Sequence, residues 1–289
     1  MPFNTPQKMC FAAGNAGVYK AGLSTFQLLL RGFMAGAYIA IGAALATVCG
    51  TGFAGGAKSL IAGVVFPVGL IAIVLTGAEL FTGDCMLVPM AALRKKIDWE
   101  SVLRVWLWVY IGNIIGSFFY AYLMSVGPFV TGGAEGALGI NAFGVNAVNI
   151  AAAKTLTYKA AGAAGLWSCF WKAIGCNYLV NIAILLALCA DNVIGKFFGI
   201  WFPIMAFVAS GFEHCVANMY FLPTAVFLTR WHPEVINEVG GLLAQNGGIG
   251  WGDVWFWNIL PATIGNIVGG FLFVGCFYFY AFRKEMPTE

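Results

Sequence analysis

Charged residues are scarce in this chain. They make up 9 % of its 289 residues, whereas a typical soluble domain carries about 25 %. Hydrophobic residues reach 61 %, and the mean hydropathy is +0.84. This composition excludes a soluble globular domain and predicts an integral membrane protein. The net charge of +3 is too small and too dispersed to predict a nucleic-acid-binding surface.

Histidines and paired cysteines are also rare. The only histidines are His214 and His232, and none of the eight cysteines forms a C-x-x-C pair. A metal site or a disulfide framework needs such paired spacings, and no nucleophile lies beside a histidine in a catalytic pattern. We therefore expect no metal, no cofactor and no enzymatic activity, and we interpret the cysteines as small buried hydrophobic residues.

Long apolar runs, by contrast, are abundant. A helix needs about 20 apolar residues to cross a bilayer, and six candidate spans lie near 27–49, 61–91, 103–126, 166–190, 197–229 and 254–282. The second and fifth are too long for one crossing, and a Gly-x-Glu motif interrupts each of them, at Gly77-Ala78-Glu79 and at Gly211-Phe212-Glu213. Acids are costly at that depth, so we expect two broken helices that line a cavity.

A second motif pair indicates an internal repeat. The third span contains Ile111–Gly116 (IGNIIG) and the sixth contains Ile264–Gly269 (IGNIVG). Spans 1–3 (about 27–126) and spans 4–6 (about 166–282) therefore form two copies, and three spans per copy require the second copy to be inverted. We predict a single all-α transmembrane domain with six helices, a 3+3 inverted repeat, and a transport site where the interrupted segments meet.

The basic residues predict the orientation. With both termini in the cytoplasm, ten lysines and arginines lie on the inner side and four on the outer side, which agrees with the positive-inside rule. The segments 127–163 and 230–253 are then external, and the first is expected to be a long loop. The predicted location is the cell membrane.

Polar residues beside the two breaks are the candidates for function. Glu79 and Glu213 are expected to hold the breaks by accepting hydrogen bonds from the half-helices that follow, although a part in proton relay remains open. His214 lies next to the second break, and its imidazole can donate a hydrogen bond to a passing solute or supply a proton.

Four motifs in order resemble the formate/nitrite transporter family: TGAELFTGD, GCNYLVNIAILLA, ASGFEHCVANM and LPATIGNIVGG. The resemblance runs from about Phe26 to Phe282. It implies an aquaporin-like inverted repeat, a homopentamer, and one pore in each protomer.

The same resemblance assigns individual residues. It makes His214 the central pore histidine and Thr82 the hydroxyl opposite it. The matching polar positions are Asn177, Asn218 and Asn266. The matching apolar constrictions and the loop beside Thr82 comprise Phe66, Leu70, Leu80, Phe81, Val180 and Phe207.

The chain departs from the family pattern in two places. Gly83-Asp84 follows Thr82 where members usually have Asn, Ser or Thr, and Asp84 is expected to cap the half-helix or else to slow anion entry. The basic residue before the fourth span, which would attract the anion from outside, matches Lys154, with Lys159 as the rival.

The implied function is a channel or transporter for formate and similar small anions of weak acids. A lone anion is very costly in an apolar constriction, so we expect formate to be protonated on the way in and to pass His214 as the neutral acid. His214, Thr82 and Asn266 would then donate hydrogen bonds to it. Nitrite is the second choice and hydrosulfide the third. A neutral-solute pore of the aquaporin type is the remaining alternative, although its paired Asn-Pro-Ala motifs are absent.

Overall fold

The structure is a computed structural model that describes residues 3–132 and 138–287. The first half of the chain forms α1 (Pro6–Ala21), α2 (Thr25–Gly50), α3 (Gly55–Val65), α4 (Val68–Thr76), α5 (Phe81–Leu93) and α6 (Trp99–Val126). A hairpin of β1 (Val130–Gly132) and β2 (Leu138–Ile140) follows. The second half forms α7 (Ala142–Ala161), α8 (Ala163–Cys189), α9 (Val193–Ala209), α10 (Cys215–Trp231), α11 (Glu234–Val239), α12 (Gly241–Asn246), α13 (Trp251–Val254), α14 (Leu260–Ile267) and α15 (Phe277–Phe282).

Six membrane spans can be followed through these helices. Within the described ranges, five helices are long and apolar enough to cross a membrane by themselves: Thr25–Gly50, Gly55–Thr76, Trp99–Val126, Ala163–Cys189 and Trp251–Phe282. The last is a continuous helix in which π-helical turns join α13, α14 and α15. The fold is an all-α membrane fold of six transmembrane helices in two inverted copies, as the sequence predicts.

The second and fifth spans are broken at the predicted motifs. Helix α4 ends at Thr76 and is capped by Gly77, whose φ of 76° is left-handed, and the chain after α9 passes through Gly211, whose φ is 69°. Only glycine adopts this conformation without strain, so it turns the chain out of the helix. Helices α5 and α10 then begin at Phe81 and Cys215. Each span therefore consists of two half-helices with irregular backbone between them.

Glycines in the two repeated motifs allow helices to pack closely. A methyl group on Gly116 in α6 would collide with the carbonyl oxygen of Phe33 in α2. A methyl group on Gly269 would collide in the same way with the carbonyl oxygen of Ile174 in α8. Small residues at such positions let membrane helices approach until their backbones touch. The same device therefore joins the first helix of each copy to the last.

The segment 127–163, expected to be a loop, is largely helical. Helix α7 covers Ala142–Ala161, and the side chain of Asn141 caps it by accepting hydrogen bonds from the N–H groups of Phe143 and Gly144. Low hydrophobicity alone does not exclude a helix outside the membrane spans. The segment contains a run of alanines, and alanine has the highest helix propensity of any residue.

Helix α7 is the counterpart of α1. Lys20 in α1 lies 59 residues before its partner Glu79, and Lys154 in α7 lies 59 residues before its partner Glu213. Each copy of three spans is therefore preceded by a matching helix, α1 before the first copy and α7 before the second.

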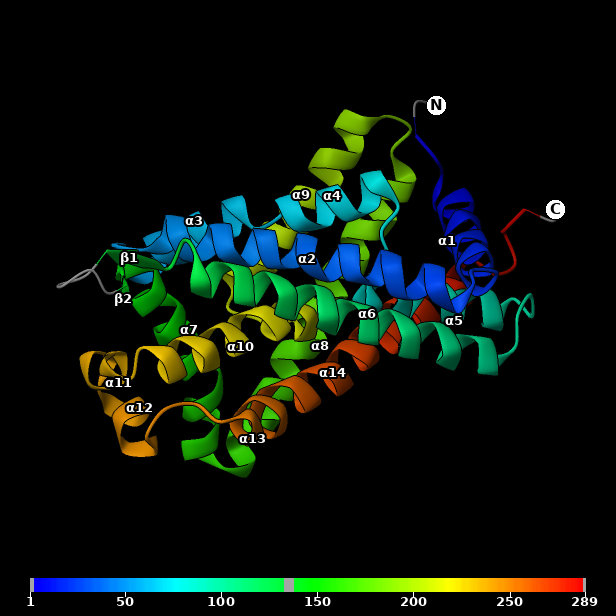
Figure 1. Cartoon of the computed structure of the whole chain (residues 1–289). Helices are drawn as coiled ribbons and strands as arrows, with labels where there is room; N and C mark the ends of the chain where they lie inside the picture. The colour runs from blue at the N-terminus through cyan, green and yellow to red at the C-terminus, as the bar shows by residue number, and fades with distance from the viewer. Residues whose placement is uncertain (1–2, 133–137, 288–289) are drawn as a thin grey trace.

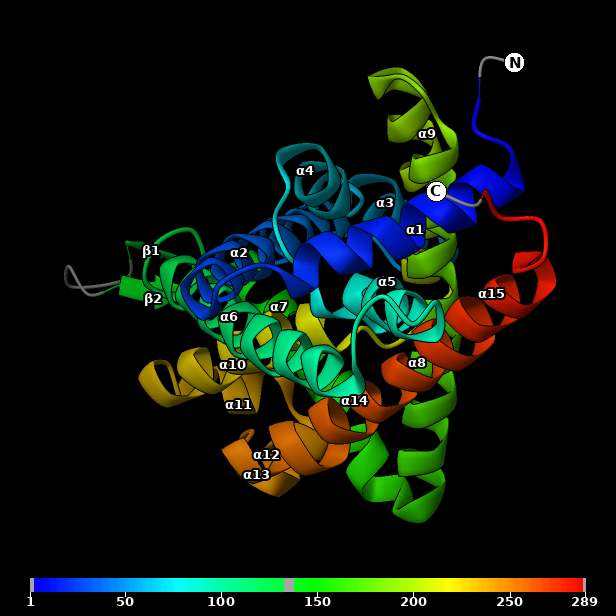
Figure 2. The ribbon, with the colours of Figure 1, turned by 90° about the vertical axis from the view of Figure 1, so that its right-hand side faces the viewer.

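The two short helices lie at opposite ends of the molecule. Figure 1 shows both chain termini and α1 at one end, and α7 beside the β-hairpin towards the other. Seen from the first end, α1 lies against α5 and α15 (Figure 2). The arrangement is that of an inverted repeat, in which matching elements face opposite sides.

Candidate functional site

Three cavities follow one another through the protein. One cavity, of about 270 Å³, is lined by residues of α1 and is named here the α1 vestibule. Another, of about 210 Å³, is lined by residues of α7 and is named the α7 vestibule. Between them lies the neck, which has no room for a water molecule and is lined by Ile39, Phe66, Leu70, Leu80, Val180, Ile204, Phe207 and His214.

Shared lining residues show that the cavities are in series. The neck shares Leu70 and Leu80 with the α1 vestibule. It shares Phe66, Phe207 and His214 with the α7 vestibule. Residues of the two broken spans therefore line the neck that separates the two vestibules.

The neck is apolar and tightly packed. Phe66 meets Phe207 edge to face, with ring centroids 5.5 Å apart, and Phe207 stacks on the ring of His214 at 5.8 Å. The four residues predicted as constrictions, Phe66, Leu70, Val180 and Phe207, all line this neck, and so does Leu80 from the loop beside Thr82. An ion entering it would lose its hydration shell without gaining a counter-charge.

Phe81, predicted to belong to the loop beside Thr82, does not line the neck. Its ring packs edge to face on Tyr110, with centroids 4.8 Å apart, and on Trp106. Leu80 has extended backbone, in which successive side chains point to opposite sides, so that Leu80 faces the neck and Phe81 faces α6. Ile39 and Ile204 complete the neck from regular helices, where no sequence signal separates them from other buried isoleucines.

His214 and Thr82 form one polar pair at the neck. The backbone N–H of Ala217 donates to His214 Nδ1 at 3.0 Å, and His214 Nε2 lies 3.0 Å from Thr82 Oγ1. A backbone N–H can only donate, so Nδ1 carries no proton and the neutral ring carries its proton on Nε2. The ring therefore caps α10 with one nitrogen and donates to Thr82 with the other.

Glu213 joins the α7 vestibule to the second break. Its carboxylate accepts hydrogen bonds from Lys154 Nζ at 2.8 Å, Tyr158 Oη at 2.7 Å and Asn218 Nδ2 at 2.7 Å. Glu213 is only 2 % exposed, and a buried carboxylate with this many donors is well compensated. It holds α7, the break and α10 together.

The structure separates the two candidate lysines. Lys154 lines the α7 vestibule together with His214 and Asn218. Lys159 lies elsewhere, paired with Asp253 at 2.8 Å and hydrogen-bonded to Asn246. Of the two candidates, Lys154 therefore lines the cavity that leads to the neck, and Lys58 lines the same cavity.

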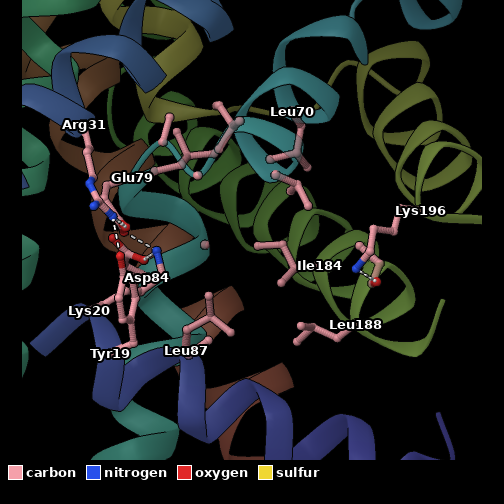
Figure 3. A pocket seen from close by; sticks show the side chains of 18 residues that line it. Tyr19, Lys20, Arg31, Leu70, Glu79, Asp84, Leu87, Ile184, Leu188 and Lys196 are labelled. Atoms are coloured by element: carbon pink, nitrogen blue, oxygen red, sulfur yellow. Dashed lines mark hydrogen bonds and ion pairs between the residues drawn. The ribbon is translucent and has the colours of Figure 1, made fainter. Parts of the chain in front are cut away.

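The α1 vestibule contains a matching cluster, shown in Figure 3. Lys20 Nζ contacts the carboxylates of Glu79 and of Asp84, the latter at 2.8 Å, and Arg31 Nη1 lies 3.9 Å from Glu79. The predicted capping role of Asp84 is wrong, because within the described chain neither of its carboxylate oxygens accepts a backbone hydrogen bond. Lys20 was not selected from the sequence, although its spacing from Glu79 equals that of Lys154 from Glu213.

Asn266 and its repeat partner Asn113 brace the two breaks. Asn266 accepts from the N–H of Cys215 at 2.8 Å and donates to the carbonyls of Ala173 and Glu213 at 2.8 and 3.0 Å. Asn113 makes the same three bonds at the first break. Both amide hydrogens of Asn266 are already donated to backbone carbonyls, and Asn266 lines neither vestibule nor the neck. The expected hydrogen bond from this side chain to a solute therefore has no free donor.

The other two asparagines differ in position. Asn177 Nδ2 donates to the carbonyl oxygens of Thr82 and Asn266, which places it behind the breaks. Asn218 lines the α7 vestibule and donates to Glu213 and Asn258. Of the five residues predicted as the polar centre of the pore (Thr82, Asn177, His214, Asn218 and Asn266), His214 and Asn218 line one of the three cavities, and Thr82 contacts the ring of His214.

An inverted repeat whose broken helices meet at a dry neck is typical of membrane transport proteins. The family model described as formate/nitrite transporter matches residues 7–280. This chain therefore belongs to the formate/nitrite transporter family.

Individual relatives agree over nearly the whole chain. It is 38 % identical to a protein named probable formate transporter from Methanothermobacter thermautotrophicus, covering 98 % of each chain. It is 35 % identical to formate channel BtFdhC from Bacillus thuringiensis, covering 99 % of this chain and 98 % of that one. The solved structure described as a pentameric formate channel with formate bound has a TM-score of 0.73 and 30 % identity, covering 90 % of this chain and 98 % of that one.

Proposed function

We propose that this protein is a membrane channel for formate and similar small anions of weak acids, and that formate crosses it together with a proton. The observation that carries the proposal is the dry neck between two vestibules, each of which is lined by two lysines. The names of the relatives support formate as the substrate. The proposed assembly is a homopentamer in the cell membrane.

The first step is capture of the anion. In the α7 vestibule the side chain of Lys154 is 20 % exposed and lies 2.8 Å from Glu213. Two unit charges 4 Å apart attract by about 4 kcal/mol near a protein surface. Lys154 raises the local concentration of anions, while Glu213 keeps the vestibule from binding them too tightly. In the proposed orientation this vestibule faces outward and the α1 vestibule faces the cytoplasm.

The second step is passage through the neck. Its walls offer formate no counter-charge, so the anion takes up a proton from vestibule water before it enters. The neutral acid has a carbonyl oxygen that accepts a hydrogen bond. Because Nε2–H of His214 donates to Thr82 Oγ1 in this structure, the acid either takes over that hydrogen bond or accepts one from the Thr82 hydroxyl. The acid loses its proton again in the far vestibule.

The remaining candidate residues hold the two helix breaks in place. Glu79 and Glu213 hold the broken ends, and Asn177 and Asn266 fix the half-helices behind them. The neck is built from large apolar side chains, which favours the smaller anions; nitrite and hydrosulfide follow formate. An aquaporin-like pore for neutral solutes is disfavoured because the paired Asn-Pro-Ala motifs are absent from the sequence and acid-bearing breaks stand in their place.

The test is flux into proteoliposomes that enclose a pH indicator. Labelled formate should enter in a saturable way, and the lumen should acidify as it enters. Nitrite and hydrosulfide measured in the same vesicles give the order of substrates. Rapid glycerol flux without formate flux would refute the proposal. Formate flux with no change of internal pH would refute the claim that a proton crosses together with formate.

A further inference from the structure

Asp84 and Asn218 occupy the same place in the two copies. Asn218 follows the break residue Glu213 by five positions, and Asp84 follows Glu79 by the same five (84 − 79). Both lie in the first turn of the half-helix after a break, and both are completely buried. The copies thus have an amide on the α7 side and a carboxyl group on the α1 side.

The difference between Asn218 and Asp84 changes the hydrogen bonding around the vestibule lysines, Lys154 and Lys20. Asn218 donates to Glu213 Oε2 at 2.7 Å, so the Glu213 carboxylate is supported by an uncharged donor as well as by Lys154. An ionised Asp84 has no hydrogen to donate to Glu79. Lys20 lies between these two carboxylates and contacts both. It therefore has two anionic partners where Lys154 has one.

We propose that Asp84 is a proton-operated switch that controls how strongly Lys20 attracts anions into the α1 vestibule. When Asp84 is ionised, it competes with the incoming anion for Lys20. When Asp84 takes up a proton from vestibule water, it gains an O–H that can donate to Glu79 as Asn218 does to Glu213. Lys20 then retains one carboxylate partner, as Lys154 does. This inference rests on the proposed function.

The other charges around Asp84 leave the direction of the effect unchanged. Lys20 comes from α1, Arg31 from α2, Glu79 from the break and Lys196 from α9 across the cavity (Figure 3). These three cations and two carboxylates give the vestibule one excess positive charge when Asp84 is ionised, and two when it is protonated. From α6, Trp106 donates to the backbone oxygen of Asp84, which adds no charge.

The consequence is that pH should change formate entry from the α1 side more than entry from the α7 side. Acidification on the α1 side should increase anion capture there beyond the effect of acid on formate itself. At the matching position of the α7 vestibule, the amide of Asn218 does not titrate in this range. The ring of His214 lies at the neck, which flux from either side must cross, so its titration affects both directions alike. Entry from the α7 side supplies the internal reference.

The experiment compares initial formate flux from the two sides in oriented proteoliposomes, with the same pH on both sides in each run. The ratio of α1-side to α7-side flux cancels the protonation of formate in water. In the wild type this ratio should rise by about fivefold between about pH 7.5 and about pH 5.5, the factor that corresponds to one ion pair whose lysine is still 12 % exposed to the vestibule. In Asp84→Asn the ratio should be high and independent of pH. A pH-independent ratio in the wild type, or an unchanged pH dependence in Asp84→Asn, would overturn the switch.

The reciprocal variant Asn218→Asp is the matched control. It moves the acid to the other vestibule, so the double variant Asp84→Asn/Asn218→Asp should reverse the pH dependence of the ratio. If the ratio keeps its wild-type direction in the double variant, the proposed relation between the two positions is wrong.

A second measurement does not require transport. Infrared spectra of the wild type should show the carbonyl band of a protonated carboxylic acid on acidification, and Asp84→Asn should lack that band. If the wild type carries no formate in either direction, the proposed function fails while this band still decides whether Asp84 takes up the proton. Absence of an Asp84-dependent band refutes the switch even where formate flux is normal.

Discussion

Replacement of Asn266 by alanine distinguishes a brace from a solute ligand. The substitution removes the acceptor of the Cys215 N–H and the donors to Glu213 and Ala173. The Cys215 N–H and the Glu213 carbonyl lie at a helix break, and an unsatisfied buried group costs about 1–3 kcal/mol. Ala173 lies inside α8, where its carbonyl also accepts a hydrogen bond from a helical N–H. Losing the bond from Asn266 therefore costs less free energy at this carbonyl than at the other two groups. The sum is about 4 kcal/mol.

The assay is thermal unfolding of the detergent-solubilised protein, followed by formate flux in liposomes. For a chain of this size a loss of about 4 kcal/mol corresponds to a fall in the melting temperature on the order of 10 °C. Asn113→Ala should produce a similar fall, because Asn113 makes the same three bonds in the other copy. Asn149→Ala is the control, since that side chain is exposed and its loss should change stability by less than about 0.5 kcal/mol.

A different outcome would refute the reasoning. If Asn266→Ala melts like the wild type and yet loses formate flux, its amide contacts the solute rather than the backbone. If Asn113→Ala is much less damaging than Asn266→Ala, the two breaks are not braced alike.

Three further predictions concern the vestibule and the polar pair. Lys154→Gln should raise the formate concentration needed for half-maximal entry from the α7 side and weaken its dependence on salt, whereas Lys159→Gln should leave both unchanged; equal effects would contradict the separation of these lysines. His214→Asn should preserve the cap of α10, while His214→Phe should lose about 1 kcal/mol of stability; both should lose any pH gating of flux that depends on the imidazole, and unchanged gating in both would exclude that role. Thr82→Ser should transport like the wild type and Thr82→Ala several times more slowly, because only the hydroxyl is lost; equal rates in both would make Thr82 merely structural.

The broken spans were predictable because their signals are local. A glycine followed by an acid inside a long apolar run has few explanations other than a helix break, and Gly77 and Gly211 do adopt the left-handed backbone that the break requires. The repeated asparagine motifs were also visible in the sequence. Their function was not, because the partners of Asn266 lie 93, 53 and 51 residues away.

Other features depend on direction or tertiary contact, which a single sequence does not reveal. Phe81 follows Leu80 directly and has similar hydrophobicity, and only the extended backbone at Leu80 sends the two side chains to different places. Lys20 and Arg31 resemble ordinary basic residues near the end of a span until they are seen beside Glu79. Helix α7 was missed because its apolar character is weak, although its pairing with Glu213 repeats that of α1 with Glu79.

The cap on α10 limits how protons can move. A histidine that relays protons takes one up at one ring nitrogen and releases one from the other, or turns its ring between two partners. Nδ1 of His214 is committed to the Ala217 N–H, and turning the ring would break both the cap and the contact with Thr82. The neck next to it has no room for a chain of water molecules. In the described part of this structure a bare proton therefore has no relay past His214, which agrees with the proposal that a proton crosses as part of the neutral acid.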